Sequence, residues 1–131
     1  MDSLVLAKKI ADICYKKLGQ DTIVLDMSND SILCDYFVIS DGQTSNQLRD
    51  MCTTIDHELS QDGIEPKSIQ GKNGNIWTLM DYNSVVVHLF ITGDRRFYNL
   101  EGLWNSAPIV YSPDANQTED TTATDATKPV D

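Results

Sequence analysis

Val85-Val86-Val87-His88-Leu89-Phe90-Ile91 is a run that is apolar at odd and even positions alike, with His88 as its polar residue. Successive side chains of a β-strand point to opposite faces of the sheet, so a run of this kind needs cover on both faces. The run is also rich in β-branched and aromatic residues, which strands favour. Residues 85–91 are therefore predicted to form a central strand, around which the rest of the fold is arranged.

A hairpin is expected to lead into this strand. Residues 76–81 form another apolar run, and the Tyr82-Asn83-Ser84 segment between the two runs has the length of a short hairpin loop. Runs at 22–27, 35–40 and, more weakly, 67–70 also have the composition of strands. The sequence thus predicts five strands.

Two amphipathic helices are predicted from apolar residues at helical spacing. The first ends at Gly19, and its apolar stripe consists of Leu6, Ile10, Ile13, Cys14 and Leu18. The second follows a chain break at Asp41-Gly42, is capped by Thr44 or Ser45 and ends at Asp62-Gly63. Its stripe consists of Leu48, Met51, Cys52, Ile55 and Leu59. This helix is long enough to connect two parallel strands.

These elements predict an α+β domain over residues 1–112, with a mixed five-stranded sheet and helices packed mainly on one face. A third, shorter helix at 95–104 would cover part of the other face, so apolar surface is expected to stay exposed there. Residues 113–131 contain five acidic residues, one lysine and no aromatic residue. This composition is typical of a disordered acidic tail.

The net charge of −10 disfavours direct nucleic-acid binding and favours encounter with a basic partner. The three cysteines, Cys14, Cys34 and Cys52, lack CxxC spacing, and we interpret them as reduced core residues. No run approaches the roughly 20 apolar residues of a membrane span, and the first residues do not have the pattern of a targeting peptide. We therefore expect a cytoplasmic protein.

Neither catalysis nor metal binding is predicted. His57 and His88 lie 31 positions apart without a cluster of ligand residues around either, and no phosphate-binding glycine motif occurs. His88 is interpreted as a hydrogen-bonded structural residue, and Asp81 as a residue that caps the hairpin turn. The chain is expected to be no enzyme and to need no cofactor.

The hairpin segment 77–82 is the candidate binding site. Trp and Tyr are enriched at binding hot spots, where each often contributes about 2 kcal/mol or more. Alternation puts Trp77, Leu79 and Asp81 on one face of the strand and Tyr82 on the other. At least one aromatic side chain should therefore point away from the main core. For Trp77, core packing and partner contact both remain open.

Three blocks of the sequence resemble, in order and spacing, the motifs of the Iojap or ribosomal silencing factor family. They are Asp35-Tyr36-Phe37-Val38-Ile39-Ser40 with Gly42 and Thr44-Ser45; Trp77-Thr78-Leu79-Met80-Asp81-Tyr82 with Val85-Val86-Val87-His88; and Arg96-Phe97-Tyr98-Asn99-Leu100-Glu101-Gly102-Leu103-Trp104. Three blocks in order are far more specific than one short motif. The family usually has Gly-Asp where this chain has Asn83-Ser84, so no role of that Asp is transferred.

The resemblance implies a nucleotidyltransferase-like topology without nucleotidyltransferase activity. It further implies binding to the large ribosomal subunit through ribosomal protein number fourteen at the intersubunit face, which would block joining of the small subunit and repress translation. A homodimer is also implied. The family's partner contacts would fall on Trp77 and Tyr82, with Leu79 and Asp81 included as their neighbours.

Two alternatives use the same features. The implied topology and the turn at 42–45 would also suit a nucleotidyltransferase-like enzyme. Such enzymes hold Mg²⁺ with paired carboxylates on a strand, whereas Asp26, Asp35 and Asp81 have no acidic residue two positions away. Uncovered sheet surface would equally suit a plain homodimerisation module.

Overall fold

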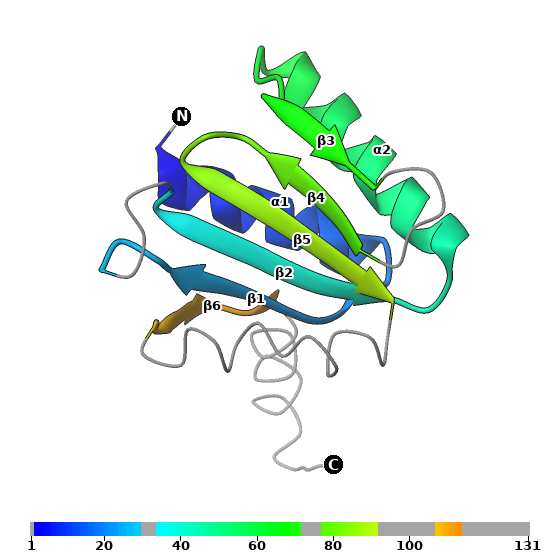
Figure 1. Ribbon diagram of the computed structural model, residues 1–131, viewed down its shortest axis with the longest axis horizontal. Coiled ribbons are helices and arrows are strands. Elements are labelled where there is room, and N and C mark those ends of the chain that lie inside the picture. Colours follow the sequence, from blue (N-terminus) through cyan, green and yellow to red (C-terminus); the bar gives the residue numbers. More distant parts are fainter. Residues whose placement is uncertain (1, 30–33, 72–76, 92–106, 114–131) are drawn as a thin grey trace, which may run out of the picture.

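The computed structural model of the chain describes residues 2–29, 34–71, 77–91 and 107–113. Its strands form one sheet in the order β3-β4-β5-β2-β1-β6 (Figure 1). The strand bounds are β1 Gln20–Asp26, β2 Tyr36–Gly42, β3 Ser68–Gln70, β4 Trp77–Asp81, β5 Val85–Ile91 and β6 Ile109–Tyr111. Neighbouring strands are antiparallel except β2 and β5, which run parallel. The sheet is therefore mixed, and β5 has strands on both sides, as predicted for a central strand.

Both described helices lie on the same face of the sheet (Figure 1). The apolar stripes of α1 (Ser3–Lys16) and α2 (Ser45–Gln61) pack against β1, β2, β4 and β5. The main core between these layers includes Ile10 of α1, Met51 of α2 and Val87 of β5, which are completely buried. No helix among the described residues combines the length and the apolar character that a membrane span needs.

A second apolar cluster occupies the opposite face of the sheet, which carries no helix among the described residues and which we call the helix-free face. Its buried members are Leu25, Met27, Cys34, Phe37, Ile39, Phe90 and Ala107. Trp77 and Val86 are partly buried and pack against this cluster. Because β5 alternates between the two clusters, with Leu89 in the main core and Phe90 in the second, both of its faces are covered as predicted. The three cysteines are buried and free, which confirms their interpretation as reduced core residues.

The two helices begin at side-chain caps. The Asp2 carboxylate accepts hydrogen bonds from the backbone N–H groups of Leu4 (3.2 Å) and Val5 (3.4 Å). Thr44 Oγ1 accepts one from the Gln47 N–H at 3.1 Å, which confirms Thr44 as the cap of α2.

α1 ends differently from the prediction. The Gly19 N–H donates to the Cys14 carbonyl (2.8 Å) and the Leu18 N–H to the Tyr15 carbonyl (3.0 Å), which together form a Schellman motif. Leu18 occupies the left-handed position of this motif, with φ 66°. Its side chain is 78% exposed, so its assignment to the apolar stripe was wrong.

The predicted chain break at Asp41-Gly42 was also wrong. Both residues belong to β2, where they pair with Phe90 and Ile91 of β5. Asp and Gly are common in turns, but here the parallel ladder with β5 keeps them extended. Asp41 is consequently buried in the sheet.

The five-stranded prediction lacks β6, a three-residue strand that pairs antiparallel with β1. β6 is also tied to α1, because the Tyr111 hydroxyl donates to Asp12 Oδ1 at 2.6 Å. The predicted parallel pair exists, but β3 and β4 intervene between α2 and β5. The predicted helix at 95–104 and the predicted tail beyond residue 113 lie outside the described residues.

Candidate functional site

The hairpin of β4 and β5 places Trp77 and Leu79 on the helix-free face. Trp77 packs against the second apolar cluster, and Leu79 and Asp81 follow it at two-residue intervals along β4. In the antiparallel register Trp77 lies opposite Phe90, and Leu79 lies opposite His88. Alternation therefore predicted correctly that Trp77, Leu79 and Asp81 share a face.

Four rings from three strands meet on this face, and we call Phe37, Trp77, His88 and Phe90 the aromatic cluster. The indole of Trp77 stacks on Phe90 with 5.2 Å between the ring centroids. His88 on β5 lies between Phe37 of β2 and Trp77 of β4, with its ring centroid 4.5 Å from that of Phe37 and 5.8 Å from that of Trp77. These ring contacts restrict the rotation of the Trp77 side chain, which would turn more freely if it were fully exposed.

His88 is hydrogen-bonded inside this cluster, as predicted for a structural residue. Its Nδ1 accepts a hydrogen bond from Trp77 Nε1–H at 3.2 Å. An indole N–H can only donate, so a neutral His88 must carry its proton on Nε2. Nε2 is buried and has no hydrogen-bond partner in the described part of the chain. An orphaned buried donor of this kind costs about 1–3 kcal/mol of stability.

Burial lowers the pKa of His88 to about 4, because a charged imidazole loses its hydration among the aromatic rings. Between pH 7 and pH 5 the unfolded chain therefore gains a proton at His88 that the folded chain does not. We predict that the free energy of unfolding falls by about 2 kcal/mol more in the native protein than in His88→Phe over this range.

Urea unfolding of both proteins at pH 7, 6 and 5 measures this difference. The two chains share all their other titratable groups, so the comparison isolates His88. A stability difference that is the same at pH 7 and pH 5 would contradict the prediction.

A surface pocket of about 250 Å³ lies beside the indole, at the edge of the sheet formed by β3. It is lined by Gln70, Gly71, Trp77 and Leu79. Both Trp77 and Leu79 are partly buried, so their side chains still offer apolar surface to a partner. Gln70 is exposed on the neighbouring strand and adds an amide at the rim. Aromatic and apolar side chains beside polar groups are the usual composition of protein–protein contacts.

Asp81 is used within the turn. Its Oδ1 accepts a hydrogen bond from the Asn83 N–H at 2.8 Å, and Asn83 has the φ of 70° that a tight hairpin turn requires. The structure confirms Asp81 as a turn-capping residue.

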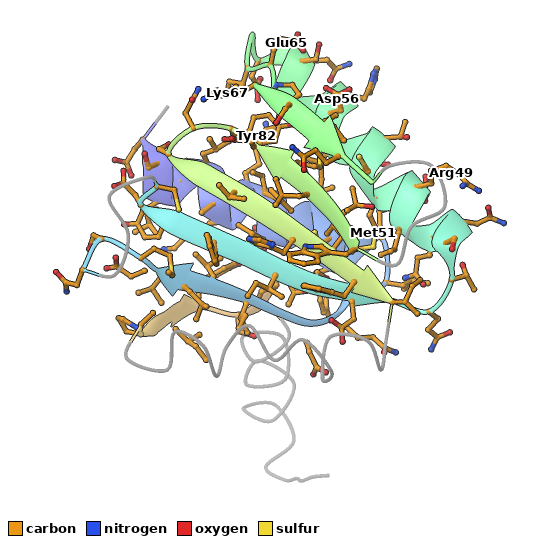
Figure 2. The ribbon with its side chains drawn as sticks, in the orientation of Figure 1. Arg49, Met51, Asp56, Glu65, Lys67 and Tyr82 are labelled. Carbon is orange, nitrogen blue, oxygen red and sulfur yellow. The ribbon has the colours of Figure 1, made fainter. Side chains whose placement is uncertain are left out.

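Tyr82 points to the other face and is brought into the main core. Its side chain is 5% exposed, on the α2 side of the sheet near Asp56 and Glu65 (Figure 2). Burial raises the pKa of its phenol, and Asp56 adds to the effect. The described structure therefore does not present Tyr82 to a partner, in contrast to Trp77 and Leu79. Sequence reasoning left two residues out of the site: Gln70, which lines the pocket beside them, and buried His88, which accepts the hydrogen bond of Trp77.

The nucleotidyltransferase-like alternative requires a metal site built from carboxylates. No group of three His, Cys, Asp or Glu among the described residues is arranged to hold a metal ion. The carboxylates of Asp26 and Asp81 accept hydrogen bonds in their own turns, and the bonds from Ser28 lower the pKa of Asp26. A larger cavity of about 630 Å³ at the end of α1 is lined by Tyr15 and Lys16 among other residues, but by no carboxylate.

Comparisons with known proteins identify relatives of the chain. A family model described as "Ribosomal silencing factor during starvation" matches residues 1–131. The chain is 35% identical over 109 residues to the ribosomal silencing factor RsfS of Bacillus subtilis, which covers 83% of this chain and 92% of that protein. It is 30% identical over 98 residues to the mouse protein named "Mitochondrial assembly of ribosomal large subunit protein 1", covering 72% of this chain and 43% of that protein.

Two solved structures have the same fold. A crystal structure of a Chromobacterium violaceum protein matches with a TM-score of 0.77 and 25% identity, covering 80% of this chain and 88% of that one. A Bacillus halodurans protein matches with a TM-score of 0.68 and 32% identity, covering 82% and 95%.

Proposed function

Because the chain belongs to the ribosomal silencing factor family, we propose that it binds the large ribosomal subunit in the cytoplasm, blocks joining of the small subunit and so represses translation. The Bacillus subtilis relative is named a ribosomal silencing factor and the mouse relative is named for assembly of the large ribosomal subunit, and a ribosomal partner follows from the family. We further propose that the chain contacts ribosomal protein number fourteen at the intersubunit face, without any catalytic step.

One observation carries this proposal: partly buried Trp77 and Leu79 line a surface pocket together with Gln70 and Gly71. The indole is held by a hydrogen bond and by stacking, so little side-chain freedom is lost when a partner covers it. Aromatic anchors of this kind supply much of the affinity in protein interfaces.

The charge of the chain supports the same partner. At −10 it attracts basic proteins and is repelled by the phosphates of ribosomal RNA. We therefore propose that a basic ribosomal protein, rather than RNA, forms the contact. Silencing then needs no chemistry, because a bound protein at the intersubunit face excludes the small subunit by its volume.

Sedimentation tests the proposal. Purified protein is mixed with isolated large subunits and, in a second set, with both subunits under conditions that favour their association. We expect the protein to co-sediment with the large subunit and to reduce the fraction of joined ribosomes as its concentration rises.

For substitutions of Trp77, Ile109→Glu is the matched control, because Ile109 is 59% exposed on β6 at the far edge of the sheet. This variant should behave as the native protein. A chain that dimerises by light scattering but leaves free and joined subunits unaffected would instead be a plain dimerisation module, and the proposal would be wrong.

A further inference from the structure

Trp77 depends on a neighbour that reaches it across the hairpin. His88 lies on β5, two residues before Phe90, the residue opposite Trp77, and its Nδ1 accepts the indole N–H at 3.2 Å. The imidazole is itself fixed by Phe37, with the ring centroids 4.5 Å apart. The Trp77 indole is thus held by stacking on Phe90 and by a hydrogen bond to His88.

The choice of histidine is costly for the fold. The residue is 4% exposed, and its buried Nε2–H has no hydrogen-bond partner among the described residues. Phenylalanine would fill a similar volume among these rings with no polar group to satisfy, so packing alone does not account for the imidazole. What histidine supplies and phenylalanine does not is the acceptor at Nδ1.

We propose that His88 is a positioning residue that holds the Trp77 indole in one orientation and so preorganises the partner-binding surface. This inference rests on the proposed function of that surface. His88 does not contact the partner; it acts through Trp77. A fixed indole loses less conformational freedom on binding, so its hydrogen bond to His88 raises affinity even though the imidazole lowers stability.

The first measurement needs no ribosome. In the native protein the Nε1–H of Trp77 should exchange slowly with solvent, as seen by NMR with the two indole signals assigned through Trp77→Phe. His88→Phe should speed this exchange, whereas His88→Asn, which keeps an acceptor at the δ position, should retain part of the protection. Unchanged exchange in a folded His88→Phe variant would overturn the proposal, whatever the ribosome data show.

Binding provides the second measurement. His88→Phe should weaken co-sedimentation with large subunits by about fivefold to tenfold, the size expected when one ordering hydrogen bond is lost. The same variant should be at least as stable as the native protein in urea at pH 7. A merely structural histidine would predict the reverse for stability, with affinity unchanged in the fraction that stays folded.

A double variant separates positioning from direct contact. Trp77→Phe has already lost the N–H donor, so Trp77→Phe/His88→Phe should bind no more weakly than Trp77→Phe alone. Additive losses would mean that His88 acts independently of Trp77, and the proposal would fail. If the native protein does not bind large subunits at all, the proposed function fails, while the indole exchange still decides whether His88 positions Trp77.

Discussion

Trp77→Ala is expected to weaken binding to the large ribosomal subunit by about 30-fold, which corresponds to about 2 kcal/mol. The substitution removes the indole that forms one wall of the 250 Å³ pocket and the ring that stacks on Phe90. Leu79 and Gln70 also line the pocket, but their positions are fixed by the pairing of β4 with β3, so they do not replace the lost indole. Quantitative co-sedimentation over a range of protein concentrations measures the change.

Loss of binding has to be distinguished from loss of the fold. Trp77 is partly buried, so its removal also lowers stability, and the assay is run where circular dichroism shows the variant to be folded. Ile109→Ala shortens an apolar side chain on β6 that is 59% exposed, and it should bind normally. A folded Trp77→Ala variant that binds as well as Ile109→Ala would show that the partner does not use this surface.

The largest effect on stability is expected at Gly19. A Cβ at this position would lie 2.4 Å from Ser40 Oγ and 2.8 Å from the Cys14 carbonyl oxygen. Ser40 cannot easily yield, because its Oγ is 2.7 Å from Thr22 Oγ1 in a buried hydrogen bond. Gly19→Ala should therefore lower the free energy of unfolding by about 3 kcal/mol, as measured by urea denaturation.

Gly63→Ala is the matched control. Gly63 has φ 79° but no atom within 4 Å of the added methyl group, so only backbone strain of about 1 kcal/mol is expected. Gly19→Ala/Ser40→Ala removes the nearest clashing atom and should recover part of the loss. Equal effects of Gly19→Ala and Gly63→Ala would contradict the steric explanation.

Local patterns predicted most of the fold because the relevant signals lie close together in the chain. The bounds of β5 follow from its continuous apolar run, and the turn at Asn83 follows from turn chemistry. β6 has only three residues, too few for a periodic signal, and it is stabilised by pairing with β1 from the far end of the chain. Asp41 resembles a turn residue, and only its pairing with Phe90 of β5 and Gln20 of β1 shows that it belongs to a strand.

The candidate site was predictable in part for the same reason. Alternation groups Trp77 with Leu79 and separates both from Tyr82, but it does not say which face the helices cover. That choice depends on how α1 and α2 pack, and it puts Tyr82 in the main core. The hydrogen bond between Trp77 and His88 depends on the register of the hairpin, which composition does not reveal.

The parallel pairing of β2 with β5 also constrains how the protein is made. Tyr36 pairs with Val85, 49 positions later, so the sheet cannot close until β5 has left the ribosomal exit tunnel. Before that moment α1, β1 and β2 are already outside, with the central edge of β2 unpaired and apolar. Closing so long a loop costs chain entropy before any ladder bond forms, which makes this step a slow one in folding. A nascent chain of this protein therefore exposes an incomplete, apolar sheet that is prone to aggregation until its last strands have been synthesised.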